Sequence, residues 1–502
     1  MRPRATSAAT GGEAAGTGRR AARVPTSLRL PALVVGSLPV PLALAVAAVA
    51  GGVFHLAYQP GCAWLMPVFL LGVWRLALGW RGSNRAAFYG GLALGLALDL
   101  PQLGFFWGIF GAAACSLWLI LAFWTGLFFL LARGVQARLG LAGAVVALPF
   151  LWTGLEYFRG ELYYLRFTWV TPGDALGSCA ASSPLAGAGV YGYSFLVLAL
   201  YSGLWLLSQR GWRWAALGFA ALELAAVGQQ VQRRLTLGGL ATTLPVAGVQ
   251  LEFPDQLQVL AALDKLLVRA PAAELIVLSE YTFDGPVPGH VRQWCRTHAR
   301  YLIAGGKEWT PDGNFYNTAF VIGPGGQVAF QQAKAVPIQF FKDGRPAPTQ
   351  RVWASPWGKL GLCICYDLSY ARVVDRLIRQ GAQALIVPTM DVAAWGPHEH
   401  ALHARVGPVR AAEYGVPVFR VASSGVSQLV DAQGRVGASA SYPGGGEMLF
   451  GELRLAGPGR LPLDRWLAPA CSGATLLTAM GLAVAALAER RRGVAGSQSP
   501  VA

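Results

Sequence analysis

The sequence predicts a multi-span α-helical membrane domain of about eight helices, joined to an extracytoplasmic α/β domain. Only 13% of the 502 residues are charged, about half the share usual in soluble proteins, and 54% are hydrophobic. Mean hydropathy is +0.43. This composition excludes a disordered chain and argues against a purely soluble enzyme. Long apolar runs fill the first 230 residues, whereas short apolar segments alternate with amphipathic ones after them.

Seven apolar runs precede residue 229 and one follows residue 465. A helix needs about 20 apolar residues to cross the hydrocarbon core of a bilayer, and most of these runs are long enough. Asp99 and Pro101 interrupt the third run, and the seventh is short and contains Glu223. We therefore expect eight helices within the following ranges: 31–57, 62–80, 86–106, 108–132, 139–158, 184–208, 211–228 and 466–488.

The net charge of +16 indicates membrane topology and not nucleic-acid binding. With the N-terminus in the cytoplasm, the short external loops hold only Arg159 and Arg166, and fifteen arginines fall in cytoplasmic segments. One missing helix would invert every later loop, so this asymmetry supports the expected number of spans. The segment 229–465 then lies outside the cytoplasm, between a basic cytoplasmic tail at 1–30 and another tail at 489–502. The fifteen are Arg2, Arg4, Arg19, Arg20, Arg23, Arg29, Arg81, Arg85, Arg133, Arg138, Arg210, Arg213, Arg490, Arg491 and Arg492.

The segment 229–465 has the pattern of an α/β domain. Its strands are apolar enough to be buried on both faces, which predicts a layered fold with a sheet core. GPGG (323–326) and DAQGR (431–435) are typical of hairpin turns. We expect strands at 244–251, 274–279, 301–306, 315–322, 359–364, 384–389 and 416–423, and helices at 255–269, 287–300, 369–380 and 398–414.

Three polar residues follow apolar strand-like segments of this domain. Glu280 follows LIVLS, Lys334 follows VAFQQA and Cys365 follows LGLCI. Reactive side chains of α/β folds collect at strand ends, where loops present them. A helix beginning near Ser369 would lower the pKa of the Cys365 thiol. A free cysteine is also often an inert core residue, and we expect that of Cys363.

These segments resemble a known family. LIVLSEYTF (275–283), the lysine of QQAKAVP (331–337) and GLCICYDLSY (361–370) resemble the Glu, Lys and Cys blocks of the carbon–nitrogen hydrolase (nitrilase) superfamily. The eight-helix frame with the domain inserted before the last helix is similar to the apolipoprotein N-acyltransferases within it. MDVAAWG (390–396) and the segment 404–425 are similar to later blocks of that family. The resemblance implies an α-β-β-α sandwich for residues 229–465.

The resemblance also implies a ping-pong N-acyltransferase. Cys365 would take an acyl chain from a membrane phospholipid as a thioester, Glu280 would act as general base, and Lys334 would stabilise the oxyanion. The acceptor would be the amine of a diacylglyceryl-cysteine lipoprotein. The implied protein is a monomer in the bacterial cytoplasmic (inner) membrane, with its catalytic domain on the periplasmic side. It needs no cofactor and no metal, and it binds no nucleic acid.

The lysine block departs from the family pattern. The family lysine lies five residues before the proline, where this chain has Gln332, whereas Lys334 lies three before Pro337. We favour Lys334, with Lys342 as a competing candidate. The resemblance assigns supporting roles to Asp343, Tyr366 and Asp367, the last replacing a glutamate.

Two other kinds of protein remain alternatives. A membrane-anchored amidase or hydrolase of the same superfamily would release the acyl group to water. A transporter would need broken helices paired between two halves, which this sequence lacks. The cluster His398, Glu399, His400 and His403 is not an HExxH motif, and we expect it to begin a helix beside the site.

Overall fold

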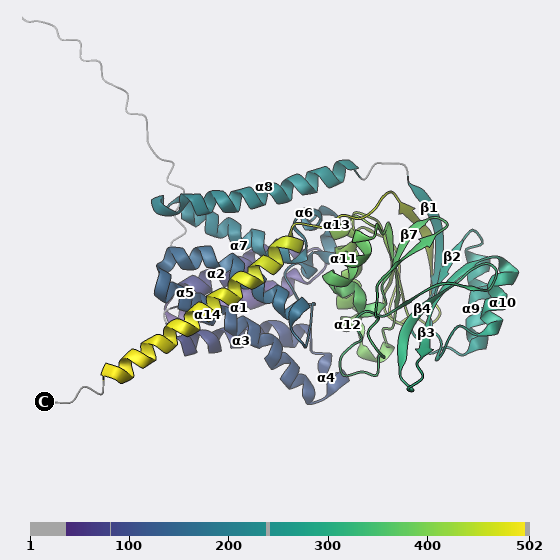
Figure 1. Ribbon diagram of the computed structural model, residues 1–502, viewed down its shortest axis with the longest axis horizontal. Coiled ribbons are helices and arrows are strands. Elements are labelled where there is room, and N and C mark those ends of the chain that lie inside the picture. The colour runs from purple at the N-terminus through teal and green to yellow at the C-terminus, as the bar shows by residue number, and fades with distance from the viewer. Residues whose placement is uncertain (1–36, 81, 237–240, 497–502) are drawn as a thin grey trace, which may run out of the picture. The chain divides into compact units, whose positions relative to one another are not determined.

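The computed structural model describes residues 37–80, 82–236 and 241–496 (Figure 1). Its first part, residues 37–236, is helical, and one further long helix follows the β-rich region. Gly140, with φ 72° and ψ −176°, divides α5 into two arms. The principal helices are α1 (Val40–Ala57), α2 (Met66–Gly79), α3 (Asn84–Gln102), α4 (Phe106–Phe110), α5 (Ala113–Tyr157), α6 (Leu185–Ala188), α7 (Val190–Leu207), α8 (Arg213–Thr236) and α14 (Asp464–Gly496).

Each of the eight expected spans overlaps one of these helices, with the two arms of α5 corresponding to 108–132 and 139–158. By length and composition, four helices within the described ranges are apolar enough to cross a membrane: Val40–Ala57, Ala113–Leu162, Val190–Leu207 and Asp464–Arg492. Ala63–Gly79 is apolar but shorter. The described helices thus agree with the apolar pattern, and the number of spans stays a prediction.

Some helix ends differ from the expected ranges. The run 184–208 is broken at Gly189, whose φ is 81° and where a Cβ would lie 2.1 Å from the Asp464 carboxylate. Helix α14 continues to Gly496, into the expected tail 489–502, because its Ala-, Glu- and Arg-rich end favours helix. The expected tail 1–30, residues 31–36 of the first run and residues 497–502 lie outside the described residues.

The second part, residues 241–455, contains two six-stranded sheets, in the orders β12-β1-β2-β3-β4-β5 and β11-β10-β9-β8-β7-β6. Their inner faces share one core that includes Val246 and Val277 of the first sheet and Ile386 and Phe419 of the second. The strands are β1 (Thr242–Val249), β2 (Leu275–Val277), β3 (Tyr301–Trp309), β4 (Phe315–Ile322), β5 (Val328–Ala333), β6 (Val352–Ser355), β7 (Gly358–Leu362), β8 (Ala384–Thr389), β9 (Val418–Ala422), β10 (Ser427–Val430), β11 (Val436–Ala440) and β12 (Met448–Leu455).

Helices cover both outer faces of this pair of sheets (Figure 1). Helices α9 (Gln256–Arg269) and α10 (Gly289–His298) pack on the first sheet. Helices α11 (Ala371–Arg379) and α13 (Val406–Tyr414) cover the second, in one core with the N-terminal helices. The α-β-β-α sandwich expected from the resemblance is confirmed.

The expected strands and turns all occur, and β4 and β8 have the expected bounds. The turns at 323–326 and 431–435 close through Gly326 N–H to Gly323 O and Gly434 N–H to Asp431 O. The expected helix 398–414 is divided into α12 (Pro397–Ala404) and α13, since Pro408 has no N–H for the carbonyl of Ala404. The strands β6, β10 and β11 were not predicted because they are only four or five residues long, and the eight-residue β12 (MLFGELRL) was missed although five of its residues are apolar.

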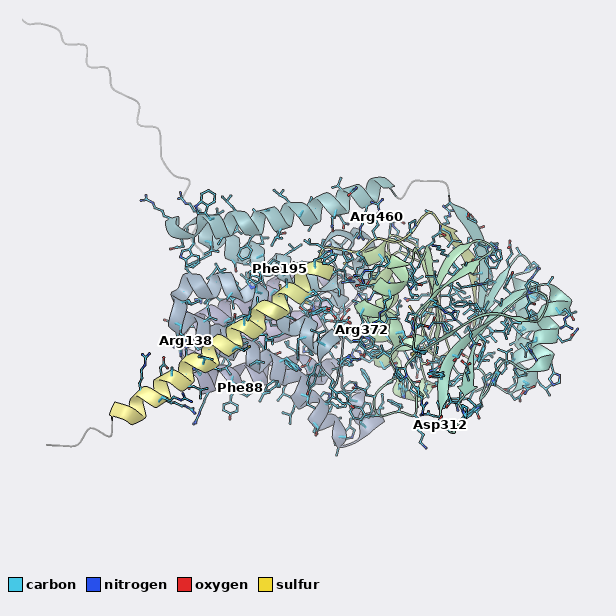
Figure 2. All side chains as sticks on the ribbon, viewed as in Figure 1. Phe88, Arg138, Phe195, Asp312, Arg372 and Arg460 are labelled. Carbon is cyan, nitrogen blue, oxygen red and sulfur yellow. The ribbon has the colours of Figure 1, made fainter. Side chains whose placement is uncertain are left out.

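Buried polar contacts join the sandwich to the N-terminal helices. The Glu161 carboxylate accepts from the Ala371 N–H, 2.7 Å away, at the start of α11. Arg372, on the same helix, donates to the Glu161 carbonyl at 2.6 Å (Figure 2). At the base of α14, Arg465 pairs with Asp375 and Glu413, each at 2.7 Å. The second sheet is therefore held firmly against the helical part.

Candidate active site

Three side chains that follow strand ends meet between the two sheets. Glu280 follows β2, Lys334 follows β5 and Cys365 follows β7, and each is at most 1% exposed. The Lys334 ammonium lies 2.8 Å from Glu280 Oε1. The structure thus brings together the acid, cation and thiol that the sequence singled out.

The Glu280 carboxylate is fixed by hydrogen bonds on both oxygens. Asn317 Nδ2 donates to Oε1 at 2.5 Å, and the backbone N–H of Met390 donates to Oε2 at 2.9 Å. The neighbouring strand approaches closely because residue 305 is glycine; a Cβ there would lie 2.6 Å from the Glu280 Cα. These contacts orient the carboxylate between Lys334 and the loop that carries Met390.

Asp343 is the second carboxylate on Lys334, and its Oδ2 lies 2.8 Å from Nζ. It accepts from the Tyr281 hydroxyl at 2.7 Å, from Asn317 Nδ2 at 2.8 Å and from the Ile338 N–H at 2.7 Å. Burial alone would raise the pKa of Asp343, but Lys334 holds it below its usual range. The position of Asp343 agrees with the supporting role that the resemblance assigned to it.

Among the competing lysine-block residues, only Lys334 reaches the carboxylates. Gln332 instead donates to the carbonyls of Ala333 and Thr349, each at 2.9 Å. Lys342 is exposed. Burial alone would lower the pKa of Lys334, but Asp343 and Glu280 outweigh burial and raise it well above its usual range. A fixed positive charge therefore lies beside Glu280.

Cys365 occupies a strained turn at the end of β7. Its φ is 53°, in the left-handed region that side chains rarely adopt, and such a residue costs about 1–3 kcal/mol. Its thiol lies 3.6 Å from the carbonyl of Met390, to which it donates. The expectation of a lowered thiol pKa is wrong: burial and the nearby Glu280 carboxylate raise the pKa of Cys365 well above its usual value. A 3₁₀ turn, Cys365–Ser369, separates the thiol from the expected helix, which begins at Ala371 as α11, so a base must remove the thiol proton.

Asp367 ties the lysine loop to the cysteine turn. Its carboxylate accepts from the backbone N–H groups of Ala335 at 2.9 Å, Val336 at 2.8 Å and Ile364 at 3.3 Å. Burial raises the pKa of Asp367 to about 6. The expected supporting residue therefore acts through the backbone that follows Lys334 and the backbone that precedes Cys365.

A second polar cluster adjoins the thiol; its His403 belongs to the helix that was expected beside the site, whereas Asp391 and Arg420 were not singled out from the sequence. Asp391, in the loop after β8, pairs with His403 Nδ1 of α12 at 2.7 Å and with the guanidinium of Arg420. One ligand atom each of Cys365, Asp391 and His403 lie within 4.8 Å of one another, as do those of Asp391, Glu399 and His400. A metal ion in either group would compete with the fixed charge of Arg420 on Asp391, so these residues fit a charge network better than a metal centre.

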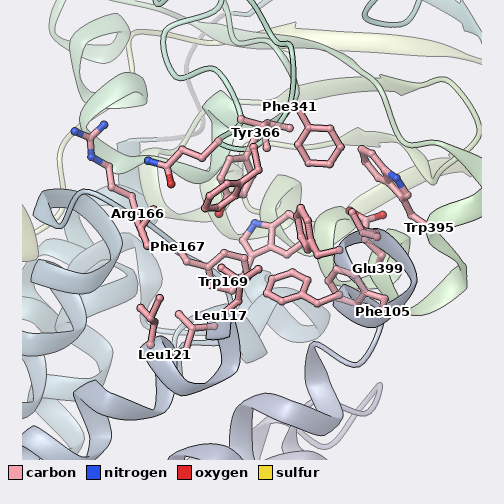
Figure 3. A pocket seen from close by; sticks show the side chains of 18 of the residues that line it. Phe105, Leu117, Leu121, Arg166, Phe167, Trp169, Phe341, Tyr366, Trp395 and Glu399 are labelled. Atoms are coloured by element: carbon pink, nitrogen blue, oxygen red, sulfur yellow. The ribbon is translucent and has the colours of Figure 1, made fainter. Parts of the chain in front are cut away.

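An open apolar pocket lies beside the triad, between the helical part and the sandwich, and encloses about 900 Å³ when the space open to solvent is included (Figure 3). Tyr366, the residue after Cys365, forms part of its wall, with its ring 5.3 Å from that of Trp169. The supporting residue Tyr366 thus faces the pocket and not the carboxylates. Other lining residues are Phe105, Leu117, Leu121, Phe167, Phe341 and Trp395.

Comparisons with known proteins agree with both parts of the chain. Residues 50–204 match the apolipoprotein N-acyltransferase N-terminal domain and residues 245–457 match the carbon–nitrogen hydrolase family. The apolipoprotein N-acyltransferase of Nitrosomonas europaea is 27% identical over 347 residues, which are 61% of this chain and 67% of that protein. The Geobacter metallireducens enzyme of the same name is 25% identical over 430 residues, 73% of this chain and 78% of that protein. A carbon–nitrogen hydrolase structure from Helicobacter pylori matches with a TM-score of 0.37 and 21% identity, covering 42% of this chain and 89% of that one.

The order of the two matched domains is the order of the two parts of the fold. The helical part carries the match to the N-terminal domain, and the sandwich with the Glu280, Lys334 and Cys365 cluster carries the hydrolase match. The relatives align across both parts. The chain belongs to the apolipoprotein N-acyltransferase family, within the carbon–nitrogen hydrolases.

Proposed function

We propose that this protein transfers a fatty acyl chain from a membrane phospholipid, through a thioester on Cys365, to the N-terminal amine of diacylglyceryl-cysteine lipoproteins. One observation carries the proposal. A buried thiol with a carboxylate and a cation beside it adjoins an apolar pocket of about 900 Å³. A pocket walled by aromatic and aliphatic side chains suits an acyl chain better than a small polar amide.

In the first half-reaction, Glu280 takes the thiol proton as Cys365 attacks the ester carbonyl of the donor. The carbonyl oxygen gains negative charge, which the ammonium of Lys334 stabilises without reorganising, because two carboxylates already hold it. The proton on Glu280 passes to the leaving alkoxide, and lysophospholipid departs. The raised pKa of Cys365 suits this order of events, since the thiol stays protonated until substrate and base are both in place.

In the second half-reaction, the uncharged amine of the acceptor attacks the thioester carbonyl. Glu280 accepts the proton that the amine loses as the C–N bond forms, and Lys334 again faces the oxyanion. The C–S bond breaks, the thiolate recovers a proton from Glu280, and the product is an amide. Both halves use the same two charged groups, which supports a ping-pong cycle.

We propose further that the chain crosses the bacterial cytoplasmic membrane eight times, with residues 229–465 on the periplasmic side as the catalytic domain. In this arrangement residues 31–228 supply seven spans and 466–488 the eighth, and the tails 1–30 and 489–502 are cytoplasmic. The arginine asymmetry supports this orientation. It brings the pocket to the level of the outer leaflet, where a phospholipid can enter from the side.

The alternative is a hydrolase that transfers the acyl group to water. The two functions are separated by supplying phospholipid vesicles and a diacylated lipopeptide to the purified full chain. Acyl transfer predicts a lipopeptide heavier by one acyl chain in amide linkage. Release of free fatty acid with no amide product would overturn the proposed transfer and favour the hydrolase.

A further inference from the structure

His403 lies beside the nucleophile, in one cluster with Asp391. It belongs to α12, its side chain is 4% exposed, and a ring nitrogen lies within 4.8 Å of Cys365 Sγ and of an Asp391 oxygen. The ring of Trp169, a wall of the pocket, packs on it with 5.0 Å between centroids. The imidazole is therefore held between the thiol and the wall of the acyl pocket.

Asp391 fixes this imidazole in one orientation. Its Oδ1 is 2.7 Å from His403 Nδ1, and its Oδ2 is paired with the Arg420 guanidinium. The Asp391 backbone is held as well, because its N–H donates to Ser423 Oγ at 3.0 Å and its carbonyl accepts from that hydroxyl at 2.9 Å. A carboxylate locked in this way keeps one imidazole nitrogen protonated and leaves the other free to take a proton.

The titratable and charged groups around His403 come from four elements. They are Asp391 of the loop after β8, Glu399 and His400 of α12 itself, Arg420 of β9 paired through Asp391, and Cys365 of the turn after β7. Asp391 and Glu399 are the carboxylates among them, and Arg420 pairs with Asp391. The pKa of Asp391 is held below its usual range: burial would raise it, but Arg420 and His403 outweigh burial.

An amine acceptor presents a problem that water does not. An α-amino group has a pKa of about 8, so at neutral pH most of it is an ammonium ion with no lone pair. It must lose one proton before it attacks and a second as the amide forms. Glu280 is positioned for one of these protons, and it is already bound to Lys334, Asn317 and the Met390 N–H. The first proton needs another base.

We propose that His403, oriented by Asp391, is a second general base that deprotonates the acceptor ammonium before it attacks the Cys365 thioester. This inference rests on the proposed function and adds a residue to its second half-reaction. The ammonium gives one proton to the imidazole, and the free amine forms the C–N bond. Glu280 takes the second proton and returns it to the leaving thiolate, and the imidazolium releases its proton to water. One amide, one thiol and one proton result from one thioester and one ammonium.

The test compares two nucleophiles on the same acylated enzyme. The full-length H403Q variant is first loaded with phospholipid, and its thioester is measured by mass. It is then discharged at neutral pH either by a diacylated lipopeptide, whose amine is mostly protonated, or by hydroxylamine, which is uncharged and needs no prior deprotonation. Because only about a tenth of an amine with a pKa of about 8 is uncharged at pH 7, we expect H403Q to discharge to lipopeptide about tenfold more slowly at that pH. Discharge to hydroxylamine should stay close to the wild-type rate.

A pH series and a matched variant complete the experiment. Raising the pH above the amine pKa of about 8 supplies free amine without a base, so the H403Q defect should shrink to within about twofold. The control is H398Q on the same helix, whose ring bonds the carbonyl of Gln102 at 2.9 Å, and it should match the wild type.

An equal loss with both nucleophiles, or a defect that persists at high pH, would overturn the role of His403. Loss of the thioester in H403Q alone would also overturn it, since that places His403 in acylation. Absence of any thioester in the wild type would instead refute the proposed function.

Discussion

Replacing Lys334 by glutamine tests whether this lysine is the cation of the site. In the wild type one ammonium lies 2.8 Å from both Glu280 and Asp343, in a region that is at most 5% exposed. The K334Q variant keeps a side chain of similar length but removes the charge. Two buried carboxylates then face each other with no cation between them.

This geometry predicts two separate losses, one of stability and one of rate. Removing one partner of a buried ion pair destabilises by about 3–5 kcal/mol, because the remaining charge is buried and unpaired. Removing an oxyanion stabiliser lowers the rate about 10²–10³-fold, or about 3–4 kcal/mol in the barrier. The double variant K334Q/D343N removes one orphaned carboxylate, so it should recover part of the stability but none of the activity.

The assay combines thermal unfolding in detergent with the rate of acyl transfer to a diacylated lipopeptide. The control is K342Q, which changes an exposed lysine in the same loop and should alter neither quantity. Full activity in K334Q, or a loss in K342Q as large as that in K334Q, would refute the assignment. Activity restored in step with stability in the double variant would show that Lys334 is structural only.

Three further predictions concern the surroundings of the triad. D367N weakens the acceptor that holds two backbone N–H groups after Lys334, so transfer should fall about tenfold or more with little change in donor KM; an unchanged rate would contradict this positioning role. Burial would raise the pKa of Glu413, but Arg410 and Arg465 hold this pKa at about 2. The free energy of unfolding of the wild type should therefore fall by roughly 3 kcal/mol as the pH falls from about 4.5 to 2. When the free energy of unfolding is measured over the same pH range, the E413Q variant should not show this loss. Replacing Ile120, in the pocket wall, by tryptophan should slow thioester formation from long-chain phospholipids about tenfold more than from short-chain ones, and equal slowing would argue against an acyl site.

The sequence predicted those parts of the site that local pattern controls. Glu280, Lys334 and Cys365 each follow a short apolar segment, and strand ends in a layered sheet are brought together by the fold. The eight apolar runs likewise predicted the long helices, since helix length depends on the run itself. The break at Gly189 was missed because it depends on Asp464, which is distant in sequence.

Other site residues carry no local signal. Asn317 lies inside the apolar strand β4 and became part of the site because β4 neighbours β3 and β5 in the first sheet. Asp391 and His403 meet only when α12 folds back beside the loop after β8. The direction of the Cys365 pKa depends on burial and on Glu280, both of which are tertiary properties. The expected helix begins at Ala371 as α11, after a 3₁₀ turn at Cys365–Ser369, and burial and Glu280 outweigh its effect on the thiol.

The central claim is a covalent acyl intermediate on Cys365, and its mass tests that claim most directly. The full-length protein is incubated with phospholipid vesicles in the absence of acceptor, digested, and the peptide bearing Cys365 is weighed, with C363A as the control for the other buried cysteine of the segment. We predict one acyl chain on Cys365, in wild type and C363A alike, that hydroxylamine removes and a diacylated lipopeptide discharges. Amide formation on the lipopeptide while Cys365 stays unmodified, or by a C365A variant, would contradict it.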